Sequence, residues 1–254
     1  MIFAIAVGNT HLVAGCLDER GARYVGRFET DLETTAEEYA IKFKCWLDIN
    51  DVDCKELEGG IISTVVPPLI SPLVKAVQYI IGREPLVVGP GVKSGLNIKI
   101  DNPAQLGADM VAGAVASLHK YPVPQIVFDL GTATTASVID KNGSFRGVVI
   151  LPGVRTALAA LSEHPSQLPH IDLTVPKHVI GTNTIDSMRS GSVLGTAAMM
   201  DGIAERIEEE LGMKAALIAT GGLAAAVIPY CRRKFIRDDH LLLDGLWLIY
   251  QKNQ

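Results

Sequence analysis

Residues 126–140, with the sequence IVFDLGTATTASVID, constrain the fold of this chain more than any other stretch. An apolar run places one acidic residue, Asp129, beside a tight Gly-Thr turn, and alternating apolar residues lead away from the turn. This pattern is typical of two paired strands joined by a turn that is rich in hydroxyl and amide donors. Gly131 lets the backbone approach an anion closely, Thr132 offers a hydroxyl, and Asp129 can hold a cation against a phosphate. The segment therefore predicts a phosphate-binding hairpin.

The first residues of the chain show the same hairpin pattern. Residues 1–21, MIFAIAVGNTHLVAGCLDERG, predict a strand, a turn at residues 8–10 and a second strand. The glycine of this turn aligns with Gly131, so Asp129 aligns with Ala6, and the first hairpin has no matching carboxylate. We infer two related halves, each of which opens with a phosphate-binding β-hairpin.

Elsewhere the sequence alternates between strand-like and helix-like stretches, as in α/β domains. The predicted strands cover residues 61–66, 145–151 and 215–219, the first and last of them buried. The predicted helices cover residues 34–48, 69–81, 104–118, 185–211 and 241–251. Asn102 is the expected cap of the third helix, with Pro103 at its first position. Gly191 and Gly195 suggest that another backbone packs closely against the fourth.

The length of 254 residues is enough for two domains of ordinary size. We expect an N-terminal α/β domain, residues 1–118, and a C-terminal α/β domain, residues 119–254, with the last helix able to pack back on the first domain.

The composition favours a globular protein that acts on small ligands. Hydrophobic residues make up 48% of the chain, which argues against disorder. The formal net charge of −5 argues against electrostatic binding to nucleic acid or membrane. The longest apolar stretch, residues 215–228, is interrupted and too short to span a bilayer. The 4 cysteines lack CxxC spacing and no signal-peptide pattern precedes them, so we expect a reduced, cytoplasmic protein.

A strand that ends in Thr-Gly-Gly, at residues 220–222, adds a third element. Gly221 and Gly222 at a helix start would let an adenine lie flat on the backbone, and two facing hairpins can hold the phosphates of a nucleotide between two lobes. The sequence has no GxxxxGK[ST] loop, no GxGxxG after a strand, no HRD of a kinase catalytic loop and no GxSxG elbow. The combination favours nucleotide binding of another kind.

Segments along nearly the whole chain resemble one family, the type III pantothenate kinases of the actin-like ATPase superfamily. These segments are AIAVGNTH, STVVPPL, DNPAQLGADM, VFDLGTATTASVID, LPGV, VIGTNTIDSMRSG, ATGGLA and LLLDGLWLIY. The resemblance implies two actin-like domains with a ribonuclease H-like fold. It also implies ATP-dependent phosphorylation of pantothenate, the first step of coenzyme A biosynthesis, by a cytoplasmic homodimer that uses Mg²⁺ and a monovalent cation, K⁺ or NH₄⁺.

By position, the resemblance implies that Asp109 is the catalytic base and that Asp129 is the ligand of the monovalent cation. The expected contacts to ATP, including the glycine pair for adenine, are Ala6, Val7, Gly8, Asn9, Thr10, His11, Leu12, Val13, Thr132, Gly221 and Gly222. The expected contacts to pantothenate are Ile100, Gly107, Ala108, Asp109, Met110 and Thr184.

The chain departs from the family pattern at four of these positions. Family members have Asp in place of Ala6 and Arg, expected to hold the pantothenate carboxylate, in place of Met110. They usually have an aromatic residue in place of Ile100 and a small polar residue in place of His11. Losing one aligned electrostatic partner costs roughly two to three orders of magnitude in turnover. Three hypotheses follow: an active kinase in which His11 and other groups compensate, an impaired paralogue that binds or regulates, or a kinase or phosphohydrolase for another small acceptor.

Overall fold

The computed structural model describes residues 1–163 and 168–254, and contacts between residues divide it into two compact units. The first unit consists of Met1–Leu96, Asp101–His119 and His240–Gln254, and the second of Asn97–Ile100 and Lys120–Asp239. The long stretch of the second unit thus begins one residue away from the boundary expected after residue 118. The last helix belongs to the first unit.

The first unit is built on a five-stranded sheet with the order β3-β2-β1-β4-β5. β1 (Ile2–Val7) pairs antiparallel with β2 (His11–Asp18), which pairs antiparallel with β3 (Gly21–Glu29). β4 (Gly59–Thr64) runs parallel to β1, and β5 (Leu86–Val87) runs parallel to β4. Every residue of β1 is buried, which places this strand at the centre of the unit.

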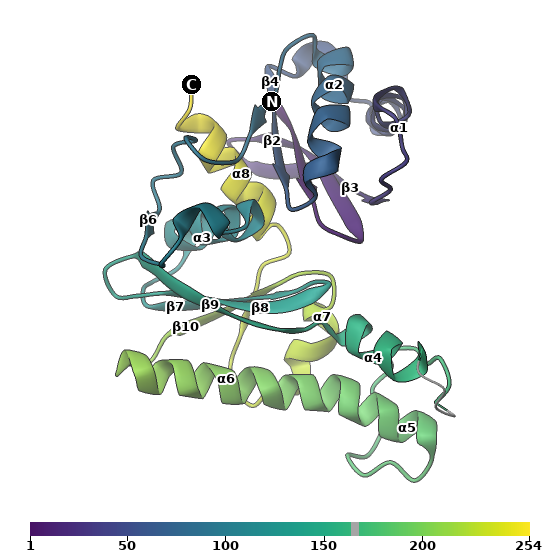
Figure 1. The fold of residues 1–254 in the computed structure, drawn as a ribbon, viewed down its shortest axis with the longest axis vertical. Helices are drawn as coiled ribbons and strands as arrows, with labels where there is room; N and C mark the ends of the chain where they lie inside the picture. Colours follow the sequence, from purple (N-terminus) through teal and green to yellow (C-terminus); the bar gives the residue numbers. More distant parts are fainter. Residues whose placement is uncertain (164–167) are drawn as a thin grey trace. The chain divides into compact units, whose positions relative to one another are not determined.

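Helices cover both faces of this sheet. α1 (Ala36–Ile49) and α2 (Ile70–Ile81) lie side by side over one face (Figure 1). Aromatic side chains from β1, β3 and α1 pack together there. α3 (Ala108–Lys120) and α8 (Leu241–Gln251) pack on the other face. A Cβ added to Gly245 of α8 would lie 1.9 Å from the carbonyl oxygen of Ala112, so only glycine allows the close approach of these two helices.

The helix predicted over residues 104–118 begins later than expected, at Ala108. The Asn102 side chain accepts a hydrogen bond from the N–H of Ala104 at 3.2 Å, but it caps only a short 3₁₀ turn, Pro103–Gln105. Leu106 has extended backbone angles and therefore interrupts the helix. The α-helix starts after Gly107, which puts Asp109 in its first turn.

The second unit repeats the same arrangement. β7 (Gln125–Leu130) pairs antiparallel with β8 (Ala133–Ile139), β8 pairs antiparallel with β9 (Ser144–Pro152), and β10 (Ala216–Thr220) runs parallel to β7. Two short edge strands complete this sheet, β6 (Asn97–Ile98) beside β9 and β11 (Ile236–Arg237) beside β10. The strands β9-β8-β7-β10 match β3-β2-β1-β4 in order and direction, which confirms the prediction of two related α/β halves, each opening with a β-hairpin.

The helices of the second unit include one nearly continuous stretch. α5 (Thr184–Arg189) leads through a π-helical segment, Ser190–Leu194, into α6 (Gly195–Leu211). α6 runs along one face of the sheet, with α4 (Val154–Glu163) beside its N-terminal end (Figure 1). α7 (Ala224–Val227) is a single turn after β10.

The prediction of close backbone packing at Gly191 and Gly195 is wrong. A Cβ added at either position would meet no heavy atom within 4 Å among the described residues, and both glycines are exposed. Both glycines line a groove beside α4, with open space where a side chain would be. No helix within residues 1–163 or 168–254 combines the length and apolar character needed to cross a bilayer.

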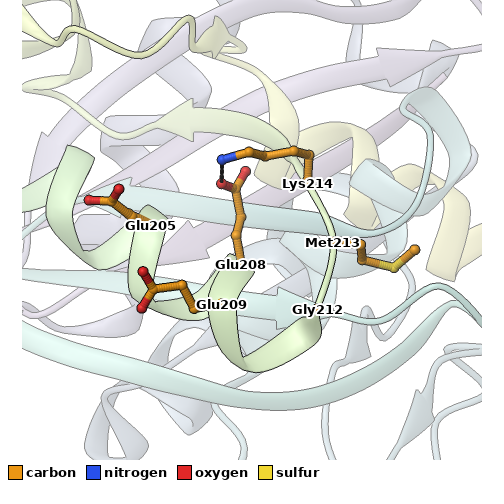
Figure 2. Close-up of a pocket in the computed structure, with 6 residues that line it drawn as sticks. All are labelled: Glu205, Glu208, Glu209, Gly212, Met213 and Lys214. Atoms are coloured by element: carbon orange, nitrogen blue, oxygen red, sulfur yellow. Dashed lines mark hydrogen bonds and ion pairs between the residues drawn. The ribbon is translucent and has the colours of Figure 1, made fainter.

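A buried carboxylate, Glu208, ties the C-terminal end of α6 to two later segments, and Figure 2 shows its contact with Lys214. Glu208 is 4% exposed and accepts hydrogen bonds from Lys214 Nζ at 2.8 Å, Arg233 Nη2 at 2.6 Å and the N–H of Ala215 at 3.1 Å. Burial alone would raise the pKa of Glu208, but these three donors lower it to about 2. The adjoining pocket, about 320 Å³ in volume, contains none of the predicted site residues, so we assign this cluster a structural role.

Replacing Glu208 with Gln is expected to lower the free energy of unfolding at pH 7 by about 3 kcal/mol, because Arg233 then loses its buried partner. The folded-state pKa lies below the unfolded value of about 4.3, so this stabilisation is present above that pH and is lost as the pH falls towards 2. Urea denaturation of wild type and Glu208→Gln between pH 7 and 2.5 measures the difference, with the exposed Glu209→Gln as control. A difference that does not shrink at low pH would contradict this account.

Candidate active site

The turn of the first hairpin is held by residues on both sides of it. The N–H of Gly8 donates to the carbonyl of His11 at 2.9 Å. Thr30, just after β3, donates its hydroxyl to the carbonyl of Gly8 at 2.7 Å and its N–H to the carbonyl of Thr10 at 3.1 Å. Asn9 and Thr10 are exposed at the tip of the turn. The sequence predicted the turn but not the bracing by Thr30, which lies 22 residues away from Gly8 along the chain.

Side chains of the first hairpin point alternately to the two faces of the sheet. Val7 and Leu12 belong to the core beneath α1 and α2, so only their backbone can contact a ligand. Ala6 and Val13 are paired across the strands and lie in the apolar cluster that includes Ala112 of α3. Ala6 is 3% exposed, and its methyl group packs in this cluster where the second hairpin has a carboxylate.

Asp109 is a largely buried carboxylate in the first turn of α3. Burial raises the pKa of its carboxyl, and hydrogen bonds from the N–H groups of Met110 and of Asp109 itself lower it by less. The N–H of Met110 lies 2.8 Å from Oδ1. A Cβ on Gly107 would lie 2.4 Å from the same oxygen, so glycine there makes room for the carboxylate. Within the described residues no lysine or arginine forms an ion pair with Asp109, which leaves it able to accept a proton.

Asp129 lies at the end of β7, between its sheet partners Thr135 on β8 and Thr220 on β10. Gly221 follows β10 with φ +91°, and a Cβ there would lie 2.4 Å from Asp129 Oδ1 and 2.6 Å from the N–H nitrogen of Leu130. Bare backbone therefore lies directly against the carboxylate. This cradle, which a Cβ would fill, offers oxygen ligands of the kind that hard cations prefer.

The turn of the second hairpin is fixed by the segment that follows β9. The carbonyl of Thr132 accepts hydrogen bonds from the N–H of Gly153 at 3.2 Å and from Thr156 Oγ1 at 2.7 Å. A Cβ on Gly153 would lie 2.2 Å from the same carbonyl oxygen. The exposed Gly222 comes just before α7. Asp129, Thr132 and Gly221 thus gather at one edge of the second sheet.

Two predicted pantothenate contacts lie elsewhere in the second unit. Thr184 is the first residue of α5, behind the capping side chain of Asn183, and lines a groove of about 700 Å³. Neither Asp129 nor Thr132 lines this groove. Ile100 follows β6 and is partly buried. The groove beside Thr184 is thus lined by other residues than the predicted phosphate and cation contacts.

The predicted residues divide between the two units. The first unit contains Ala6–Val13 and Gly107–Met110, and the second contains Ile100, Asp129, Thr132, Thr184, Gly221 and Gly222. The first unit supplies a candidate base and a candidate phosphate turn, and the second supplies a candidate cation ligand and a glycine turn. In the described part of the chain no three His, Cys, Asp or Glu side chains gather as a metal-binding group.

The chain is similar to known proteins in sequence and in fold. The family model described as type III pantothenate kinase matches residues 2–206. Proteins named type III pantothenate kinase from an Exiguobacterium species and from Exiguobacterium sibiricum are 42% and 40% identical to this chain, each over the full length of both chains. The activator of the 2-hydroxyisocaproyl-CoA dehydratase from Clostridium difficile, solved with bound ADPNP, has a similar fold, with a TM-score of 0.52, 13% identity, and coverage of 100% of this chain and 97% of that one. The predicted actin-like fold is thus confirmed.

Gly221→Ala is expected to destabilise the second unit more than a matched glycine replacement does. Gly212 has φ +69° but open space around a Cβ, so Gly212→Ala should cost only the backbone strain, about 1 kcal/mol. Gly221→Ala adds the collision with Asp129, for a further loss of about 1–3 kcal/mol. Chemical denaturation of both variants measures this. Equal losses would show that Asp129 does not lie against this turn.

Proposed function

Because the chain belongs to the type III pantothenate kinase family, we propose that it transfers the γ-phosphoryl group of ATP to the hydroxyl of pantothenate. The product is 4'-phosphopantothenate, and the reaction is the first step of coenzyme A biosynthesis. The observation that carries the proposal is the carboxylate of Asp109, which is largely buried and has no cationic partner among the described residues.

Asp109 acts as the general base in this mechanism. It accepts the proton of the attacking hydroxyl, and the raised pKa makes its carboxylate a stronger base than an exposed aspartate. Kinases work mainly by positioning and by electrostatic stabilisation, because the transferred phosphoryl group needs little covalent help. Gly107 and Ala108 provide the backbone against which the acceptor lies, and the N–H of Met110 holds Asp109 in one orientation.

Each hairpin turn offers hydrogen-bond donors to the phosphates of ATP. In the first unit these are N–H and hydroxyl groups at the exposed tip, Asn9 and Thr10, and in the second unit the hydroxyl of Thr132. The turn at Gly221 and Gly222 receives the adenine.

Cations supply the remaining positive charge when they are bound. The oxygen cradle at Asp129 fits a monovalent cation, K⁺ or NH₄⁺. Mg²⁺ keeps several waters and is commonly bound through substrate phosphates, so it needs few protein ligands. That requirement fits a first hairpin in which Ala6 offers no carboxylate.

A second function is favoured by the side chains at Ala6 and Met110. Neither side chain can form an ion pair. The chain could therefore be an impaired paralogue that binds ATP, or a kinase or phosphohydrolase for another small acceptor. ATP binding without turnover supports the first alternative. Phosphate release without pantothenate, or turnover on an uncharged alcohol, supports the second. Rescue of activity by the Ala6→Asp, Met110→Arg double variant would identify a decayed kinase.

We also propose that the protein is a cytoplasmic homodimer without nucleic-acid or membrane partners. A net charge of −5 and free thiols at Cys16, Cys45, Cys54 and Cys231 support a reducing compartment and small-molecule partners. The groove beside Thr184 supports self-association, because most of its lining is apolar and includes Leu158, Leu161, Leu168, Met188 and Met199. A groove of this kind would gain stability from being covered.

Asp109→Asn is expected to lower kcat by about 10²–10⁴-fold while leaving the KM for ATP within a few-fold of wild type, because only proton transfer is lost. A coupled assay of ADP release with ATP, Mg²⁺, K⁺ and pantothenate measures both constants. Asp101→Asn removes an exposed carboxylate from the same unit and should leave kcat unchanged. Retention of more than about a tenth of the turnover by Asp109→Asn would exclude Asp109 as the base.

Leu161→Glu is expected to convert the dimer to monomers, since a charge in an apolar contact is costly. Leu161 is 48% exposed, so the substitution should not unfold the monomer. Light scattering after size-exclusion chromatography gives the mass. Ile41→Glu, at an exposed apolar position on α1, is the control and should remain dimeric. A monomeric wild type, or a Leu161→Glu variant that stays dimeric, would count against this interface.

A further inference from the structure

We propose that Arg27 contacts the phosphates of ATP at the first hairpin and that His11 positions it. The inference rests on the proposed function, because it assumes that ATP binds at this turn. Neither the resemblance nor the predicted site includes Arg27.

The register of the sheet places Arg27 beside the hairpin. β3 pairs with β2 so that Arg27 lies opposite Val13 and Glu29 lies opposite His11. Residues opposite each other in an antiparallel pair direct their side chains to the same face of the sheet. Val13 shares its apolar cluster with Ala6 and α3, so Arg27 is on the face where Ala6 lies and α3 packs. Arg27 therefore also lies near the start of β2, directly after the turn.

A direct contact links Arg27 to the hairpin. Its Nη2 lies 3.1 Å from Nδ1 of His11. A guanidinium can only donate hydrogen bonds, so Nδ1 of His11 is the acceptor in this contact. The contact directs the exposed arginine side chain towards the first residue of β2.

The charge of Arg27 is available to a ligand. Within the described residues no carboxylate forms an ion pair with Arg27, although Glu29 lies on the same face two residues along. Arginine carries five N–H donors in a fork that matches phosphate oxygens, and one donor is used by His11. Residues 1–18, which form the hairpin itself, contain no arginine or lysine. Arg27 is therefore the cation that this sheet brings to the turn. The triphosphate of ATP is negatively charged, and Arg27 can pair with that charge whereas the apolar Ala6 cannot.

The test is calorimetric titration of the full-length protein with Mg²⁺ and ADPNP, and separately with adenosine. Arg27→Gln is expected to weaken ADPNP binding by about 10- to 100-fold. Adenosine binding should not change, because adenosine has no phosphate. Arg27→Lys keeps the charge but loses the fork, and we expect an intermediate loss. Arg20→Gln removes an exposed charge from the far end of the same pair of strands and should bind like wild type.

The positioning role of His11 is tested by a double-mutant cycle on the same measurement. His11→Phe should weaken ADPNP binding severalfold, and adding it to Arg27→Gln should have little further effect. Additive effects would overturn the positioning role. If wild type binds ADPNP and Arg27→Gln binds it equally well, the phosphate contact is overturned while the proposed function stands. If wild type binds no ADPNP, the proposed function fails and the inference fails with it.

Discussion

The site depends on the close approach of bare backbone to two carboxylates. A side chain at Gly107 would occupy the space of Asp109 Oδ1, and one at Gly221 would occupy the space of Asp129 Oδ1. Each glycine thus leaves room for its carboxylate at a fixed place against bare backbone. In the same way, the absence of a side chain lets Thr132 lie against Gly153 and lets α8 pack closely on α3 at Gly245.

The two halves show how one hairpin can diverge in function while the fold is kept. The six-residue strands β1 and β7 each pair antiparallel with the next strand and parallel with a later one. In the second half the penultimate residue of the strand is Asp129, which is partly exposed beside a glycine turn. In the first half it is Ala6, which is buried among apolar side chains. Positive charge at the first hairpin is then provided by a neighbouring strand, through Arg27.

The sequence was sufficient to predict the features that depend on local pattern. The two hairpins, the α/β class and the halves followed from apolar alternation and turn residues, which act over a few positions. The start of α3 was misplaced because Asn102 and Pro103 cap a 3₁₀ turn as readily as an α-helix. Gly191 and Gly195 were misread because glycine spacing does not show which side of a helix meets another backbone.

What the sequence could not show was pairing between distant segments. The contact of Gly221 with Asp129 joins residues on β10 and β7, and the bond between Arg27 and His11 depends on strand register. The bracing of the first turn by Thr30 is of the same kind. Such contacts are fixed by the tertiary fold and have no separate signal in a single sequence.

The central claim is that this chain phosphorylates pantothenate although Ala6 replaces a carboxylate. The most direct measurement is mass spectrometry of the reaction of wild-type protein with ATP, Mg²⁺, K⁺ and pantothenate, with the product and ADP quantified together. We predict that 4'-phosphopantothenate forms in an amount equal to the ADP released. ADP release without this product, or no reaction while ATP binds, would contradict the claim.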